Sequence, residues 1–153
     1  MIQQRDLKIL SALRTNARVK LSDISKATRV PISTIWDRLR EYEGKIIRGH
    51  ITLLDFSRLG FATRAQVLIK TDMRCREMLR EYLSKHQNVN TFCKINNGFD
   101  YMVEIVFVTI RQMEDFLENL EQKFTIHNLE IHYIVEDIKK EGFLADAELL
   151  AAT

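Results

Sequence analysis

The sequence predicts an α+β protein, with a helical N-terminal part and a C-terminal domain of order β-α-β-β-α-β. Two observations carry this prediction. Apolar residues before Gly44 recur every three or four positions, which is the period of a helix with one buried face. From Ala65 onward the period falls to two, because Ala65, Val67 and Ile69 alternate with polar neighbours, as in a half-buried strand.

Three helices are predicted in the N-terminal part. The first covers 4–14 and the second 21–28. Pro31 suits the first position of the third helix, where its missing N–H costs nothing, and Gly44 fits a stop signal. The positions expected to face the core share one helical spacing: Leu7, Ile9, Leu10, Leu13, Leu21, Ile24, Ala27, Ile32, Ile35, Leu39 and Tyr42.

The C-terminal domain is predicted to be a four-stranded antiparallel sheet with two helices on one face. A strand and connector over 46–55 precede it, and the turn at 96–98 has hairpin chemistry. The other sheet face is left uncovered and partly apolar, so a second copy of the chain is its expected partner. The predicted ranges are strands at 64–70, 89–95, 101–108 and 129–138 and helices at 73–85 and 111–124.

The first 60 residues and the remaining 93 carry net charges of opposite sign. Residues 1–60 hold 12 Lys and Arg against 6 Asp and Glu, and the rest holds 11 against 15, giving +6 and −4. This pattern is typical of a polyanion-binding N-terminal domain joined to a separate second domain. The predicted organisation is a helical domain over 1–47, a connector over 48–60, a βαββαβ domain over 61–139 and a tail over 140–153.

Composition excludes several classes of protein. The chain is 46% hydrophobic and 29% charged, which indicates a packed core rather than disorder. We expect no membrane-spanning segment, because no apolar run is long enough to span a bilayer, and no secretory leader, because polar residues begin two positions after Met1. Cys75 and Cys93 form no CxxC motif and are expected to be reduced thiols. These observations predict a cytoplasmic protein with no membrane partner.

The second and third predicted helices, joined by a short turn, follow the logic of a helix-turn-helix. In that motif the start of the third helix reaches base edges in the major groove of DNA. Ser33 and Thr34 can donate or accept, and Arg38 can fork onto guanine or phosphate. Trp36 either contacts a sugar or a thymine methyl group or packs against the first helix. The predicted outward residues are Ser33, Thr34, Trp36, Asp37, Arg38 and Arg40.

Other basic residues are candidates for contacts to the DNA backbone. Arg18, Lys20, Lys26 and Arg48 are assigned to phosphates, which position a protein without specifying sequence. Double-stranded DNA is therefore the expected partner. Two alternatives stay open: an architectural protein that wraps DNA with little sequence preference, and a small-molecule-binding βαββαβ protein with a merely structural helical head.

No catalytic or metal-binding constellation is found in the sequence. The histidines at 50, 86, 127 and 132 are scattered, and His127 and His132 do not share one face of a strand. There is no Ser/His/Asp or Cys/His set of recognisable spacing and no glycine-rich phosphate loop. The prediction is a non-enzymatic protein without a metal or cofactor.

The order and spacing of several short motifs resemble the Lrp/AsnC, or feast/famine, transcriptional regulators over nearly the whole chain. The motifs are DLKIL at 6–10, ARV at 17–19, SDI at 22–24, STI at 33–35, IIRG at 46–49, NGFDY at 97–101 and IVEDIK at 134–139. The resemblance implies a winged helix-turn-helix and a βαββαβ domain that dimerises through its sheets. It also implies assembly to an octamer or other closed ring, with an amino-acid effector bound between dimers.

The sequence departs from that family at the turn and at the implied effector site. Arg29 stands where the family has Gly. On the last strand Leu129 and Ile131 stand where the family often has Thr, which favours an apolar ligand or none. Asp100 is expected to pair an α-amino group, although 97–101 also fits a plain hairpin turn. The expected effector residues are Asn97, Gly98, Phe99, Asp100, Tyr101, Leu129 and Ile131.

Overall fold

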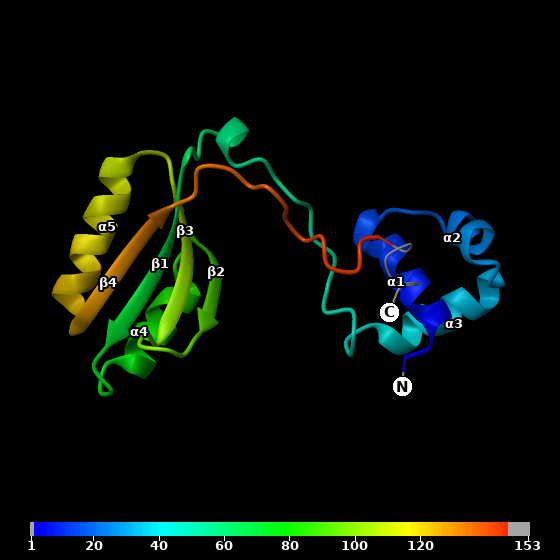
Figure 1. Ribbon diagram of the computed structural model, residues 1–153, viewed down its shortest axis with the longest axis horizontal. Helices are drawn as coiled ribbons and strands as arrows, with labels where there is room; N and C mark the ends of the chain where they lie inside the picture. The colour runs from blue at the N-terminus through cyan, green and yellow to red at the C-terminus, as the bar shows by residue number, and fades with distance from the viewer. Residues whose placement is uncertain (1, 147–153) are drawn as a thin grey trace. The chain divides into compact units, whose positions relative to one another are not determined.

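The computed structural model, which describes residues 2–146, begins with three helices that follow one another closely (Figure 1). Their bounds are α1 Gln4–Thr15, α2 Leu21–Thr28 and α3 Ile32–Tyr42. Each lies within a residue or two of the predicted range, because the apolar spacing and the Pro31 and Gly44 signals agree with one another. Pro31 takes the N-cap position of α3 rather than its first turn.

A small apolar core joins these helices. It contains Ile9 of α1, Ile24 of α2, Val30 of the turn and Ile35 of α3. The predicted core position Ile32 is wrong, because this residue is 49% exposed. Three residues of helix turn through about 300°, so Ile32 is rotated about 60° away from Ile35 and toward solvent. Ala27 is also exposed rather than buried.

The turn between α2 and α3 is held in a strained conformation. Arg29 caps α2 with φ 58° and ψ 29°, in the left-handed region, and its N–H donates to the carbonyl of Ser25 at 2.8 Å. Glycine adopts this conformation without steric cost, whereas a residue with a Cβ pays about 1–2 kcal/mol. The departure noted in the sequence is therefore a real source of backbone strain.

Replacing Arg29 with Gly should raise the free energy of unfolding by about 0.5–1 kcal/mol, since it removes most of this strain at some cost in unfolded-chain entropy. Urea titration is the measurement. Arg29→Ala is the matched control, because it removes the same side chain but keeps the Cβ, and it should give no gain. Equal gains in both variants would place the effect in the side chain and contradict the backbone explanation.

Residues 138–146 return to α1. Arg14 donates to the backbone oxygens of Glu141 at 2.9 Å and Phe143 at 3.1 Å, and the hydroxyl of Thr15 donates to the carbonyl of Ala145 at 2.7 Å. Accordingly, one compact unit comprises residues 2–53 and 138–146, and the other is Leu54–Asp137. The predicted tail at 140–153 lies partly outside the described residues.

The second unit has the βαββαβ order that the sequence predicts. The sheet runs in the order β2-β3-β1-β4, and every neighbouring pair is antiparallel. The short helix η1 Ser57–Leu59 precedes the sheet. No helix in the described part of the chain is long and apolar enough to cross a membrane. The bounds are β1 Thr63–Thr71, α4 Arg76–Lys85, β2 Val89–Lys94, β3 Tyr101–Phe107, α5 Ile110–Lys123 and β4 Ile126–Tyr133.

Two predicted strands are wrong in position. Within 46–55 the structure has only an isolated bridge from Glu43 to Ile47, because this segment has no strand to pair with. The last strand begins at Ile126 rather than at 129 and ends at Tyr133. Its start is fixed by pairing with β1, where Ile126 lies opposite Thr71 after an irregularity in register. Sequence alternation alone carries no information on that partner.

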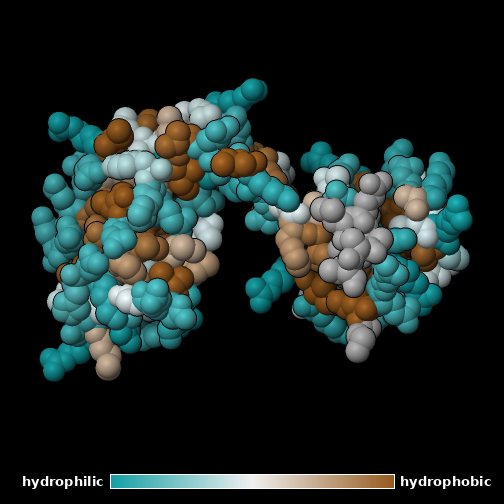
Figure 2. All heavy atoms as spheres, viewed as in Figure 1, coloured by the Kyte–Doolittle hydropathy of each residue, from teal (hydrophilic) through white to brown (hydrophobic). Residues whose placement is uncertain are grey.

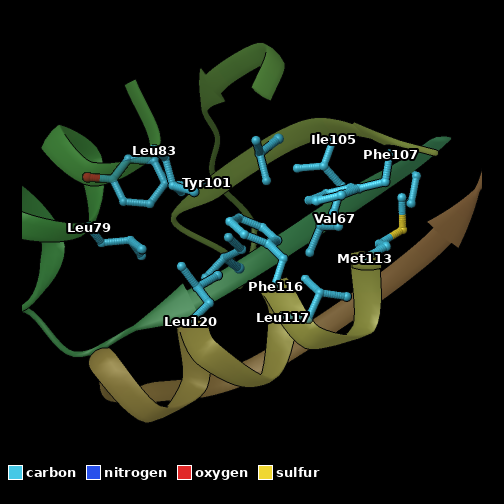
Figure 3. Packing of buried hydrophobic residues seen from close by; sticks show 13 residues of the cluster. Val67, Leu79, Leu83, Tyr101, Ile105, Phe107, Met113, Phe116, Leu117 and Leu120 are labelled. Atoms are coloured by element: carbon cyan, nitrogen blue, oxygen red, sulfur yellow. The ribbon is translucent and has the colours of Figure 1, made fainter. Parts of the chain in front are cut away.

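Both helices of the second unit cover the same sheet face. Figure 3 shows Phe116, Leu117 and Leu120 of α5 packed toward Val67 of β1, with Leu79 and Leu83 of α4 on the neighbouring part of the core. Burial in β1 alternates without exception from Thr63 to Thr71, as the period of two predicts. This core holds the strands and helices in place and so positions the turn at 97–101 next to the start of α4.

The opposite sheet face is more polar than the sequence suggests. Leu68, Met102 and Val106 share it with a cluster of charges around Arg64. Arg64 forms ion pairs with Glu104 at 2.8 Å and with Asp137 at 2.6 Å, and Glu104 is only 7% exposed. On the side of the second unit that Figure 2 shows, apolar side chains form patches among hydrophilic ones.

Candidate nucleic-acid interface

The outward side of α3 carries the residues that the helix-turn-helix hypothesis needs. Ser33, Asp37 and Arg40 are exposed, and Thr34 is half-buried. Trp36 is 53% exposed, which favours the outward orientation over close packing against α1. Ile35 and Tyr42, on the opposite side of α3, are buried and hold the helix against the rest of the unit.

Arg38 differs from its outward neighbours because protein groups already occupy its guanidinium. Its Nε lies 3.7 Å from a carboxylate oxygen of Asp6, and its Nη1 donates to Glu41 at 3.1 Å. The hydrogen bond to Glu41, followed by the charge of Asp6, raises the pKa of Arg38. Asp6 belongs to α1 and is 2% exposed.

This ion pair joins the first and third helices. Asp6 also accepts from the backbone N–H of Gln3 at 3.3 Å, as part of the capping box of α1. Burial, and then the carboxylate of Asp6, raises the pKa of the adjacent Tyr42. We therefore interpret Arg38 as a residue that positions α3. The sequence pattern could not distinguish it from Arg40, because Asp6, the buried partner of Arg38 on another helix, is 32 positions away.

The predicted phosphate contacts are all solvent-accessible. Arg18, Lys20, Lys26 and Arg48 are exposed, and Lys26 lies 4.0 Å from Asp23, an ion pair too exposed to hold it firmly. Arg29 in the turn is exposed as well and was missing from the predicted set. A basic residue in the short turn between α2 and α3 was the sequence signal that could have identified it.

The predicted effector turn has a different arrangement from the expected one. Asn97 and Gly98 have positive φ values of 63° and 95°, as hairpin chemistry requires, but Asp100 is 7% exposed. Its carboxylate pairs with Arg76 at 2.8 Å and Lys70 at 3.4 Å and accepts from the N–H of Thr71 at 3.0 Å. The carboxylate is therefore held within the chain as a structural anchor, and its pairing with an α-amino group stays a prediction.

Burial is the largest single effect and raises the pKa of Asp100. The N–H of Thr71 and the charges of Arg76 and Lys70 together lower it by more, so the net pKa lies below the usual value. Tyr101 is 4% exposed, and its hydroxyl donates to the carbonyl of Arg76 at 3.1 Å. Phe99 is half-buried. The turn is thus tied to the start of α4 by several contacts.

Leu129 and Ile131 do not join this turn at an open site. They lie on the helix-covered sheet face, packed against the core, opposite Ile69 and Val67 of β1. Their place in an effector pocket stays a prediction. The residues that alternate with them, not they themselves, point to the open face.

A cavity of about 290 Å³ lies between α4 and β2, and sequence reasoning missed it. Its residues are separated along the chain and come together where α4 packs against β2 and β2 pairs with β3. The lining combines both signs of charge with aromatic surface: Glu77, Arg80, Ser84, Phe92, Lys94 and Tyr101. The rings of Phe92 and Tyr101 lie 5.1 Å apart.

Comparison with known proteins agrees with a helix-turn-helix unit followed by a sheet unit. Residues 2–45 match a family model described as winged helix-turn-helix DNA-binding. Over 143 residues the chain is 23% identical to the transcriptional regulator Zrp of Zymomonas mobilis, covering 91% of this chain and 94% of that protein.

Solved structures match the fold throughout. E. coli AsnC superposes with a TM-score of 0.80 at 20% identity, over 92% of this chain and 96% of that one. A transcriptional regulator from Neisseria meningitidis, in complex with L-Met, gives a TM-score of 0.84 at 19% identity, over 92% and 94%. Residues 2–45 are therefore a winged helix-turn-helix DNA-binding domain, and the chain has the two-domain fold of solved transcriptional regulators such as E. coli AsnC.

Proposed function

We propose that the protein is a cytoplasmic homodimeric regulator that inserts α3 of each subunit into the major groove of a pseudo-palindromic DNA site. The observation that carries this proposal is the outward side of α3, where hydrogen-bonding, aromatic and cationic side chains are exposed together. Two such helices related by a two-fold axis read half-sites about one helical turn apart, ~34 Å or a multiple.

Each outward residue has a role in this proposal. Ser33, Thr34 and Asp37 reach base edges, where a carboxylate accepts from the amino group of cytosine. Arg40 takes the guanine or phosphate contact first expected of Arg38. Arg18, Lys20, Lys26 and Arg48 bind phosphates, and their loss should weaken binding to all sequences alike.

The sheet unit would join the subunits. Its face opposite the helices carries apolar side chains around the Arg64–Glu104 pair and is the proposed contact between two copies. Assembly to an octamer or other closed ring remains part of the proposal.

We further propose an apolar amino acid as effector, since the related Neisseria meningitidis regulator was solved with L-Met. The cavity between α4 and β2 suits such a zwitterion better than the turn at 97–101. Arg80 and Lys94 match the α-carboxylate, Glu77 matches the α-ammonium, and Phe92 with Tyr101 offers apolar surface to the side chain.

Selection of binding sites from random DNA, with and without an amino-acid mixture, tests the proposal. We expect enrichment of one pseudo-palindromic motif at physiological salt. Trp36 is the only tryptophan, so its fluorescence should also change on binding the selected site. Salt-dependent binding without an enriched motif would instead support an architectural protein, and no binding at low salt a small-molecule-binding protein.

The effector arm uses thermal unfolding. Methionine should raise the melting temperature of the wild-type protein, and Lys94→Ala should remove most of that increase because it removes a cation from the cavity. Arg74→Ala is the control, since Arg74 is exposed but does not line the cavity. An increase that survives Lys94→Ala unchanged would overturn this placement of the effector.

A further inference from the structure

An apolar pair stands at the start of the helix proposed to enter the groove. Ile32 is 49% exposed and Trp36 is 53% exposed. The two residues are four positions apart, so their side chains lie on one side of α3 and are neighbours. Single exposed apolar residues are common on protein surfaces, but a neighbouring pair on this helix calls for a partner.

The charges around this pair indicate what the partner is. Arg40 extends the same row by four more positions, and Lys26 and Arg29 of the preceding helix and turn are also exposed. The exposed carboxylates of Asp37 and Glu41 also lie on α3, but residues 1–60 carry 12 Lys and Arg against 6 Asp and Glu, a net charge of +6, which favours a polyanion over a second apolar protein surface. Arg38, the other cation in the middle of α3, is held by Asp6 and Glu41. The first turns of α3 therefore present mainly apolar contact area and short polar groups.

The apolar feature of DNA that a major-groove helix meets is the C5-methyl group of thymine. Four residues of helix rise about 6 Å, and two base steps rise about 6.8 Å, so the pair spans nearly two steps. We propose that Ile32 and Trp36 contact thymine methyl groups and thereby set a requirement for thymine in each half-site. This inference rests on the proposed function, because it names the base chemistry that α3 reads.

Substitution of deoxyuridine for thymidine tests the inference, since it removes the methyl group and leaves the base pair intact. The binding site first selected from random DNA is synthesised with deoxyuridine at each thymine position in turn. The dissociation constants of the full-length protein are then measured on the paired duplexes. We expect about a fourfold loss of affinity for each contacted methyl group, at one or two positions per half-site.

Variants assign the effect to the two side chains. Trp36→Ala and Ile32→Ala should bind the thymine duplex more weakly. We define the thymine-to-uracil ratio as the affinity for the thymine duplex divided by the affinity for the uracil duplex. Each variant should bring this ratio near one at a single position. Met78→Ala is the matched control, because Met78 is a similarly exposed apolar residue on α4. It should leave every ratio unchanged.

The outcomes separate the two levels of the proposal. Selective binding with equal affinity for thymine and uracil duplexes would overturn methyl recognition and leave the regulator function intact. A uracil penalty that persists in both variants would overturn the assignment to Ile32 and Trp36. Failure to select any site would overturn the proposed function itself. A change of oligomeric state in Trp36→Ala, with an unchanged thymine-to-uracil ratio, would identify the pair as a contact between copies.

Discussion

Replacing Arg64 with Met should lower the free energy of unfolding of the sheet unit by about 3–5 kcal/mol, the range for breaking a buried ion pair from one side. Glu104, which is 7% exposed, would then lose its ion pair with Arg64. The amide of Asn90 and the hydroxyl of Thr91 donate to Glu104 at 3.0 and 3.3 Å but carry no charge. Urea unfolding followed by circular dichroism measures the loss.

Two companion variants make this result specific. Arg58→Met removes a cation whose pair with Asp55 is exposed on both sides, and it should cause no measurable change. The double variant Arg64→Met with Glu104→Leu removes both charges and should recover most of the lost stability. If the double variant is as unstable as Arg64→Met alone, the buried charge is not the cause.

Replacing Asp100 with Ala should cost about 2–3 kcal/mol without any ligand present. The N–H of Thr71 would lose its acceptor, and the cations of Arg76 and Lys70 would lose their shared partner. Both cations are about one third exposed, so water offsets part of the loss. Asp100→Asn keeps an acceptor for Thr71 and should cost less. Equal stability of all three proteins in urea would contradict the anchoring role.

The same carboxylate predicts a pH dependence with a definite sign. Because folding lowers the pKa of Asp100, the stabilisation is fully present above the unfolded value of about 3.9 and is lost as pH falls through the lower folded value. The stability difference between the wild-type protein and Asp100→Asn should therefore shrink below about pH 4. A difference that stays constant between pH 7 and pH 3 would show that the charge of Asp100 does not contribute.

Sequence patterns predicted the elements wherever local signals agreed. The range of α2 was predicted without error, and the alternation of β1 gave the buried face residue by residue. The predictions of strand bounds failed where pairing with a strand distant in the sequence determines the structure. The pairing of Ile126 with Thr71 fixes the start of β4, and the lack of a pairing strand leaves the segment after Ile47 without one.

The same distinction between local signals and distant contacts holds for the candidate site. The outward position of Trp36 and Arg40 follows from helical spacing, so the sequence could indicate it. The engagement of Arg38 by Asp6, and of Asp100 by Arg76, depends on contacts between elements that spacing does not contain. The cavity beside Lys94 is of the same kind, because three elements, α4, β2 and β3, build it together.

The return of residues 138–146 to α1 has a consequence for how the chain is made. Synthesis proceeds from the N-terminus, and domains generally fold as they emerge. The whole of Leu54–Asp137 is thus available before the last contacts of the DNA-binding unit, those of Arg14 with Glu141 and Thr15 with Ala145, can form. The DNA-binding unit is therefore the first to be synthesised and the last to complete its contacts. A growing chain has the proposed subunit contact of the sheet unit before residues 138–146 can pack on α1.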